Sequence, residues 1–166
     1  MARYSLGFQS KVMIATADAA SLTSNGYAAF LQGGSGTMQL KVNEVYIAGE
    51  SAASNPTTMA FGRDSTVGVT SITAVGNFNA LLDASAVAPG TIAVFGSGAT
   101  TNPQRSATLG HLLMPTLNAF GGIARWQARY GEEITAIGNT ASLGELSLSA
   151  VTGTGQVSGH VLYELV

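Results

Sequence analysis

The chain contains few side chains of the types that bind metals. It has no cysteine and only two histidines, His111 and His160, which lie far apart in the sequence. A cupin-like metal site needs clustered histidines and a carboxylate, with two histidines close together on one strand so that both face the metal. This pattern is missing, so the sequence predicts no bound metal and no other cofactor. We expect His160 on the solvent side of a strand and His111 at a loop edge or an interface.

Serines, paired glutamates and glycine-rich segments do not form a catalytic motif either. No Gly-x-Ser-x-Gly elbow is present, and no base is placed beside a serine. Glu132 and Glu133 are adjacent, so in a strand they would point to opposite faces and could not act as a paired acid and base. The Gly96–Gly98 and Gly121–Gly122 segments lack the Gly-Lys-Ser/Thr ending of a phosphate loop. We therefore predict that the protein is not an enzyme.

Arginine remains as a residue type suited to protein contacts, because its planar guanidinium group makes several directed hydrogen bonds. We expect a docking surface near an N-terminal arm of residues 1–8, at an exposed turn of residues 61–65 and in a loop of residues 96–105. Deleting residues 2–8 is expected to abolish docking without unfolding the protein. The candidate interface residues are Arg3, Tyr4, Phe8, Arg63 and Arg105.

Strands must position these residues, and the clearest ones lie near the C-terminus. In residues 156–166 and again in 144–151, apolar side chains occupy every second position, which is the period of a half-buried strand. The linker of residues 152–155 is predicted to join them as a hairpin loop. The second of these strands carries Glu145, Ser147 and Ser149 on the face opposite its leucines.

Residues 123–130 form a third clear strand, with Ala124, Trp126, Ala128 and Tyr130 predicted on its core face. Gly131 then turns the chain, and residues 132–137 begin another strand.

An earlier strand changes phase, because Leu40 and Val42 lie on one face and Val45 and Ile47 follow in the opposite phase. A β-bulge near Asn43 reconciles the two phases. Further strands are expected at residues 4–16, 57–61, 67–75, 91–95 and, with a weaker pattern, 105–114.

Helix signals are thin. Asn77–Ala84 has the composition for two helical turns, with Asn77 as an N-cap, and a turn is expected at Asp18–Ala20. Short β-favouring runs separated by glycine indicate a single-domain, all-β antiparallel sandwich of the jelly-roll type over residues 1–166, with about eight to ten strands and little helix.

Composition restricts the possible partners. Charged residues make up 10% of the 166 residues and hydrophobic residues 46%, with a net charge of −2. No basic run exists, so we expect no nucleic-acid binding. No signal peptide or membrane-spanning run is evident, so we expect synthesis in the cytoplasm and no membrane contact. Neutral polar groups cost less to desolvate than ions, which favours a protein whose faces are covered by neighbouring molecules.

The C-terminal part of the sequence resembles the jelly-roll decoration, or cement, proteins on the heads of tailed bacteriophages. The resemblance rests on four segments: residues 120–126 (FGGIARW), 131–133 (GEE), 144–149 (GELSLS) and 159–164 (GHVLYE). It implies a homotrimer that binds the major capsid protein from outside and stabilises the shell, located on the virion surface, with no catalytic residue.

Two other functions are carried as alternatives. One is a phage tail, fibre or lectin-like module that binds carbohydrate, with Tyr27, Phe30 and Phe78 as candidate stacking aromatics near polar loops. The other is a cupin-like metalloenzyme, which would require folding to bring His111, His160 and a distant glutamate together.

Overall fold

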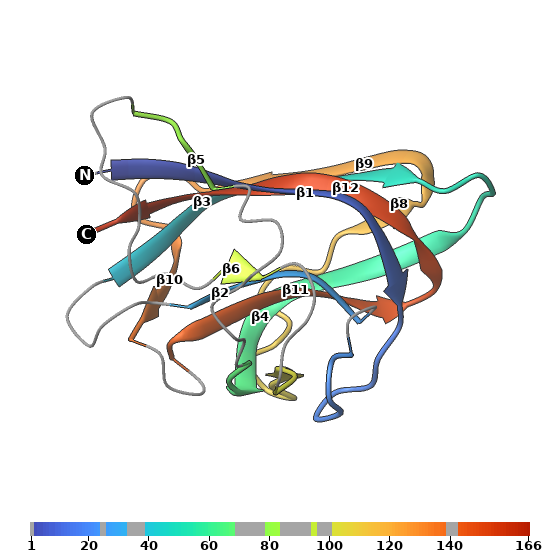
Figure 1. Ribbon diagram of the computed structural model, residues 1–166, viewed down its shortest axis with the longest axis horizontal. Coiled ribbons are helices and arrows are strands. Elements are labelled where there is room, and N and C mark those ends of the chain that lie inside the picture. The colour runs from blue at the N-terminus through green and yellow to red at the C-terminus, as the bar shows by residue number, and fades with distance from the viewer. Residues whose placement is uncertain are drawn as a thin grey trace.

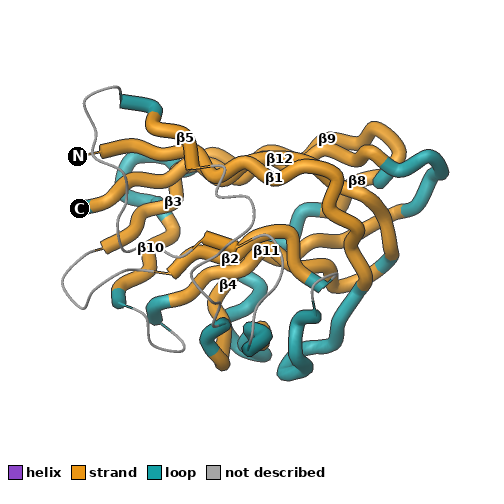
Figure 2. The backbone as a smooth tube through the Cα atoms, viewed as in Figure 1, coloured by secondary structure: helices purple, strands orange, loops and turns teal. Residues whose placement is uncertain are grey.

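The computed structural model describes residues 2–23, 26–32, 39–68, 79–83, 94–95, 101–138 and 143–166. Over these residues the chain forms strands and loops without a helix, as Figure 2 shows. The strands build two antiparallel six-stranded sheets that pack against each other (Figure 1). The prediction of an all-β sandwich is confirmed.

Twelve strands are present in the described part of the chain, more than expected, because four of them have only two or three residues. They are β1 (Ala2–Ile14), β2 (Tyr27–Gln32), β3 (Gln39–Glu50), β4 (Pro56–Thr66), β5 (Asn79–Leu81), β6 (Val94–Phe95), β7 (Gln104–Arg105), β8 (Thr116–Asn118), β9 (Phe120–Gln127), β10 (Ile134–Ile137), β11 (Glu145–Thr152) and β12 (Thr154–Leu165).

The strand order is that of a jelly roll. The first sheet has the order β10-β3-β12-β1-β5, with β9 also on the outer edge of β3. The second has the order β6-β2-β11-β4-β7, with β8 also beside β4. The long strands β1 to β4 alternate between the sheets, so that β1-β12-β3-β9 faces β2-β11-β4-β8, which is the arrangement of two interlocked Greek keys.

The predicted hairpin at residues 152–155 is wrong. β11 and β12 lie in different sheets, so the linker between them crosses from one sheet to the other. Gly153 makes the crossing with φ of 77°, and a Cβ there would lie 2.3 Å from the Pro56 carbonyl oxygen. The alternation could not reveal this, because both strands bury an apolar face in the same core, one from each side.

The core lies between the sheets and confirms most of the strand patterns. Its largest buried side chains include Tyr163, Phe61, Met13, Leu31, Leu40, Ile47, Met59 and Leu146. The β-bulge is also confirmed: Leu162 pairs with Glu44 and Tyr163 with Val42, which leaves Asn43 as the extra residue. Val42 and Val45 can therefore both face the core.

Two local predictions fail and one is confirmed. Tyr130 lies beyond the end of β9 and is fully exposed, so the core face of that strand ends with Trp126 and Ala128, which are half-buried. The helix proposed for Asn77–Ala84 is replaced over Asn79–Leu81 by β5, which pairs with β1. The turn at Asp18–Ala20 is present.

Two expected strands fall partly outside the described residues: positions 69–75 of the strand expected at 67–75, and positions 91–93 of the strand expected at 91–95. Residues 96–100 of the proposed docking loop also lie outside them. Residues 105–114 are mostly turns rather than a strand. This segment follows the edge of β4, where the Arg63 and Phe61 amides donate to the carbonyls of Leu109 and Leu113.

Candidate functional site

A hollow of about 320 Å³ lies on the outer face of the first sheet. Strands β1, β3 and β12 supply most of its wall, and the loop after β5 adds an exposed leucine. The lining residues are Arg3, Asn43, Glu44, Leu82, Gln127, Leu162, Tyr163 and Glu164. Arg3 and Glu164 are opposite each other in the β1–β12 ladder, so the hollow has both a cation and an anion on its wall. Of the predicted interface residues, Arg3 is exposed and belongs to this site.

The bulge at Asn43 creates the polar centre of this face, because it turns Glu44 outward. Glu44 is nevertheless only 5% exposed. Arg125 Nη2 lies 2.6 Å from its Oε2, and His160 Nε2 lies 2.8 Å from its Oε1. His160 also stacks on Tyr46, with ring centroids 5.2 Å apart. His160 is thus on the outer side of its strand, as expected, but it is held by two partners.

The electrostatics of this cluster oppose acid–base chemistry. Burial raises the pKa of Glu44, but the hydrogen bonds and charges of Arg125 and His160 outweigh it, so the pKa is lowered overall. A carboxylate with a lowered pKa and two donors is a weak base and does not carry a proton near neutral pH. The contacts hold Glu44, Arg125 and His160 in fixed positions on the sheet surface. Such a rigid surface is suited to binding a partner rather than to catalysis.

Tyr4 and Phe8 do not form an arm. Residues 2–8 belong to β1, which pairs with β12 on one side and β5 on the other. Both side chains point inward and are buried, and Tyr4 stacks on Tyr163 with ring centroids 5.3 Å apart. Deleting residues 2–8 would therefore remove core side chains and a ladder of hydrogen bonds, so the expectation that the fold survives this deletion is wrong.

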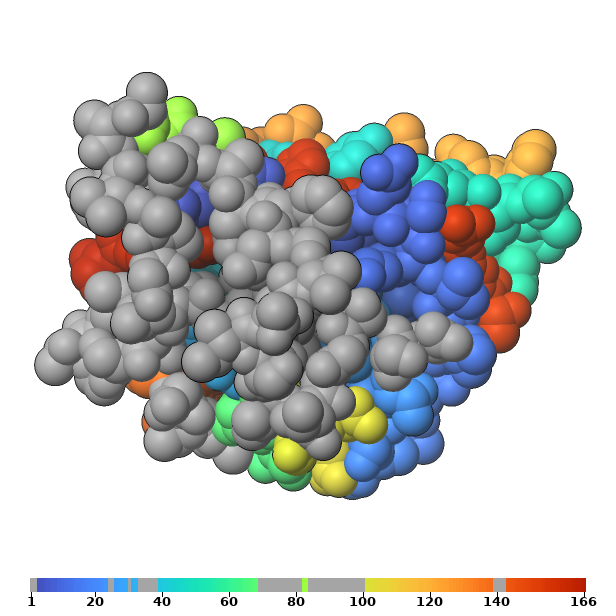
Figure 3. Space-filling view, viewed as in Figure 1, coloured from blue at the N-terminus to red at the C-terminus, as the bar shows by residue number. Residues whose placement is uncertain are grey.

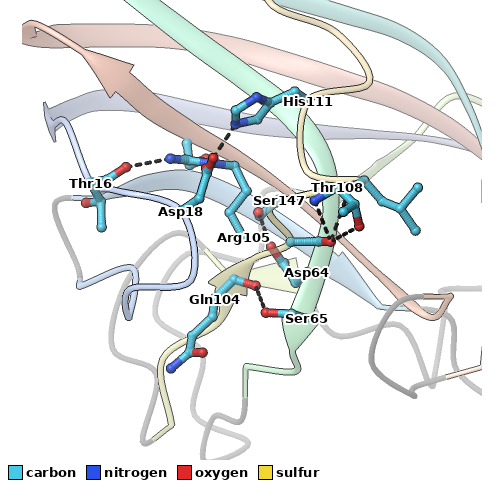
Figure 4. Close-up of polar contacts among 12 residues, drawn as sticks. Thr16, Asp18, Asp64, Ser65, Gln104, Arg105, Thr108, His111 and Ser147 are labelled. Carbon is cyan, nitrogen blue, oxygen red and sulfur yellow. Dashed lines mark hydrogen bonds and ion pairs between the residues drawn. The ribbon is translucent and has the colours of Figure 1, made fainter.

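Arg105 is also unavailable to a partner, since it is 1% exposed. Its Nε donates to Asp18 Oδ1 at 2.6 Å and its Nη2 to the Thr16 carbonyl (Figure 4). Its Nη1 donates to Ser149 Oγ at 2.5 Å. The guanidinium group therefore joins the loop after β1 to the outer face of β11. The interface role predicted for Arg105 is replaced by a structural one.

Arg63 is half-buried in β4 and donates from Nη1 to the Leu143 carbonyl at 3.2 Å. Burial lowers its pKa. It lies within a strand and not in the exposed turn that the sequence suggested.

His111 lies at a loop edge, as expected, with Nε2 3.0 Å from Asp18 Oδ1. His160 lies with Glu44 on the first sheet, so the two histidines serve different carboxylates. In the described part of the chain, no group of three histidine, aspartate or glutamate side chains is placed to hold a metal ion.

Sequence reasoning missed a buried polar layer on the outer face of the second sheet. Glu145, Ser147 and Ser149 alternate with the core leucines of β11, yet all three are buried. Asp64 on β4 joins them and accepts a hydrogen bond of 2.6 Å from Ser147 Oγ (Figure 4). Burial, and next the charge of Glu145, raise the pKa of Asp64, and burial raises the pKa of Glu145. No local signal marks this layer, because its cover comes from distant segments.

One aromatic proposed for sugar stacking is ruled out by burial. Tyr27 is fully buried in β2. The side chains of Phe30 and Phe78 lie outside the described residues.

Among the described residues, no helix has the length and apolar character to span a bilayer. Comparison with known proteins finds no family model, no curated protein and no solved structure that matches this chain.

Proposed function

We propose that the protein is a decoration, or cement, protein of a tailed-bacteriophage capsid, which self-associates as a trimer and binds the outside of the major capsid shell. The proposal combines the sequence resemblance of residues 120–164 with the surface of one strand. Its expected location is the surface of the virion, and its work is to bridge neighbouring capsid subunits.

The observation that carries the proposal is the apolar surface of the edge strand β9. β9 pairs with β3, and in the described part of the chain no strand lies on its other side. Phe120 is 60% exposed and Ile123 65%, and Tyr130, just beyond the strand, is fully exposed. Arg125 projects from the same face as Ile123, and an open strand edge with exposed apolar side chains beside an arginine is suited to a protein partner. Part of it lies along the upper margin of Figure 3.

A surface of this kind fits a partner that presents many copies. Each contact is modest, but a trimer that engages several capsid subunits gains from effective concentration without any single strong contact. The low charge content of the chain serves the same end, because little ionic solvation is lost when its faces are covered.

Co-sedimentation with shells of the major capsid protein from the same virus tests the proposal. Wild-type protein should pellet with the shells in a saturable manner, and Ile123→Lys should reduce the bound fraction at least tenfold. The matched control is Val12→Lys, which places the same charge at an exposed apolar position on β1 and should bind normally. Wild-type protein that stays in the supernatant, or equal binding by both variants, would refute the assignment.

Light scattering coupled to size exclusion tests the trimer separately. The expected mass is three times the 16.8 kDa of the chain. A monomer at micromolar concentration contradicts the trimer.

A further inference from the structure

Two carboxyl side chains, Asp64 on β4 and Glu145 on β11, meet on the outer face of the second sheet. Leu146 pairs with Arg63, so continuing the antiparallel register by one residue places Glu145 opposite Asp64. Both side chains are fully buried, and their carboxyl groups are hydrogen-bonded to each other. An ionised carboxylate only accepts hydrogen bonds, so a bond between two carboxyl groups requires a proton on one of them.

The surroundings of Glu145 favour its ionised form. The Gly68 amide nitrogen lies 2.9 Å from its Oε1 and 3.0 Å from its Oε2, and the Gln32 side-chain amide donates to Oε2. Burial raises the pKa of Glu145, but the hydrogen bonds from Asp64, Gly68 and Gln32 act in the opposite direction. These donors identify Glu145 as the carboxylate of the pair.

The surroundings of Asp64 favour its protonated form. Its Oδ1 accepts a hydrogen bond of 2.6 Å from Ser147 Oγ (Figure 4), whereas its buried Oδ2 has no donor among the described residues. A buried acceptor without a donor is destabilising, but an Oδ2–H group that donates to Glu145 has its partner. The proton of the pair therefore lies on Oδ2 of Asp64.

Arg105 on β7 is the cation opposite Asp64 in the β4–β7 ladder, and it does not replace this proton. Its guanidinium nitrogens donate to Asp18 and to two neutral oxygens, so its charge is balanced by Asp18 at 2.6 Å. Its positive charge lowers the pKa of Asp64, but burial and next the charge of Glu145 outweigh it, and the pKa is raised well above its usual range.

Other charged side chains do not offset a second ionised carboxyl group. β2 has none, and β11 has none besides Glu145. Arg63 precedes Asp64 in β4, points to the opposite face of the strand and donates to the Leu143 carbonyl. The parts of the sequence outside the described residues contain no Asp, Glu, His, Lys or Arg. Two adjacent buried anions would repel each other without hydration, so the pair holds one proton and one negative charge.

We propose that Asp64 and Glu145 share a single proton, carried by Asp64, and that this proton makes the contact between β4 and β11 sensitive to pH. Glu145 also holds Gln32 on β2 and the Gly68 amide after β4, so the contact joins three strands of the second sheet. Loss of the proton leaves two anions face to face and removes the hydrogen bond between them. This inference does not depend on the proposed function.

The shared proton should make the protein less stable as pH rises. The pKa of Asp64 is raised in the fold, whereas in the unfolded chain the group titrates near its usual value of about 3.9. Its contribution is therefore complete below about pH 4 and is lost as pH rises through the folded pKa. Glu44, the buried carboxylate of the first sheet, has a lowered pKa and acts in the opposite sense.

Infrared spectroscopy of the whole chain at pH 6 detects the proton directly, because a protonated carboxyl group has a carbonyl stretch distinct from those of carboxylates and amides. The wild type should show this band, Asp64→Asn should lose it, and the control Glu44→Gln should keep it. A wild type without the band overturns the proposal. So does a band that persists in Asp64→Asn and disappears in Glu145→Gln, which would place the proton on Glu145.

Urea unfolding between pH 5 and pH 9 measures the stability that the proton contributes. In Asp64→Asn the side-chain amide keeps a donor toward Glu145 at every pH. The folding equilibrium constant of the wild type should therefore fall, relative to that of Asp64→Asn, by about tenfold for each pH unit until the folded pKa is passed. Parallel profiles for the two proteins overturn the pH sensitivity.

The two conservative variants should also differ from each other. Glu145→Gln replaces the acceptor of the Gly68 and Gln32 donors by an amide, so at pH 6 its folding equilibrium constant should be about tenfold or more below that of Asp64→Asn. Equal stability, or a lower stability for Asp64→Asn, overturns the assignment of the proton to Asp64. If Glu145→Gln does not fold, the infrared bands of the wild type and Asp64→Asn decide.

Discussion

Two ion pairs of equal length in this protein should differ severalfold in their effect on stability. Arg105 and Arg125 each contact a carboxylate oxygen at 2.6 Å, but the Arg105 side chain is 1% exposed and the Arg125 side chain 56%. Replacing each arginine by methionine keeps much of the apolar stem and removes the guanidinium group. The comparison therefore contrasts a buried guanidinium group that has three partners with an exposed one that has a single carboxylate partner.

The magnitude follows from the groups left without a partner. Arg105→Met removes the donors to the Ser149 hydroxyl and the Thr16 carbonyl, and an unsatisfied buried acceptor costs about 1–3 kcal/mol. It also removes one of the two partners of Asp18, which keeps its contact with His111 and, at 34% exposed, recovers part of its hydration. The expected loss is about 4 kcal/mol, within the usual cost of breaking a buried pair. Arg125→Met should lose less, about 1 kcal/mol, because Arg125 is exposed and its buried partner Glu44 keeps the contact with His160.

Urea unfolding followed by the fluorescence of Trp126, the single tryptophan, measures both variants in the same way. Equal losses for the two variants, or a loss below about 2 kcal/mol for Arg105→Met, would refute the argument. Arg105→Lys should lose an intermediate amount of stability. Lysine keeps the positive charge but lacks the planar guanidinium group that reaches three acceptors.

Two further perturbations follow from the geometry. The pKa of Glu44 is lowered in the fold, so its carboxylate stabilises the protein above the unfolded pKa of about 4.3, and this contribution is lost as pH falls through the lower folded value. Glu44→Gln should therefore be less stable at pH 7 and lose less stability between pH 5 and pH 3 than the wild type. Gly62→Ala places a Cβ 2.2 Å from the Gly110 carbonyl oxygen and should cost about 3 kcal/mol. Gly121→Ala meets no atom within 4 Å but has φ of 75°, so it should cost only about 1 kcal/mol.

Urea midpoints across pH measure the first of these, and parallel pH profiles for Glu44→Gln and wild type would contradict it. The glycine pair serves as its own control. A larger loss for Gly121→Ala than for Gly62→Ala would show that the close approach of residue 110 to β4 is wrong.

The sequence predicts most of the sandwich because its signals are local. Alternation identifies β11, β12 and β9, and the change of phase around Asn43 correctly predicts the bulge that turns Glu44 outward. Alternation also places Tyr4 and Phe8 on one face, but it does not say whether that face is buried. Their assignment to an arm failed because pairing with β12, at the other end of the chain, decides it.

The buried polar layer could not be predicted in this way. The partners of Arg105 lie 87 and 44 residues away, at Asp18 and Ser149. No short pattern joins them. Glu145 and Ser147 alternate with leucines in the manner of a half-exposed strand, and only the segments folded over β11 remove them from water. Sequence alone therefore predicts that the polar face of a strand is exposed to solvent. Only the structure shows that other segments pack over it.

The strand order also constrains when this chain can fold. β12 lies between β1 and β3 in the first sheet, and β11 lies between β2 and β4 in the second. The central strand of each sheet therefore belongs to residues 145–165, which are synthesised after all the other strands of the two sheets. Until then β1 and β3 have no common neighbour, and their apolar faces and open edges stay exposed to other nascent chains. Neither sheet can close before residues 145–165 have been synthesised, and a chain truncated before residue 145 would yield two half-built sheets prone to aggregation.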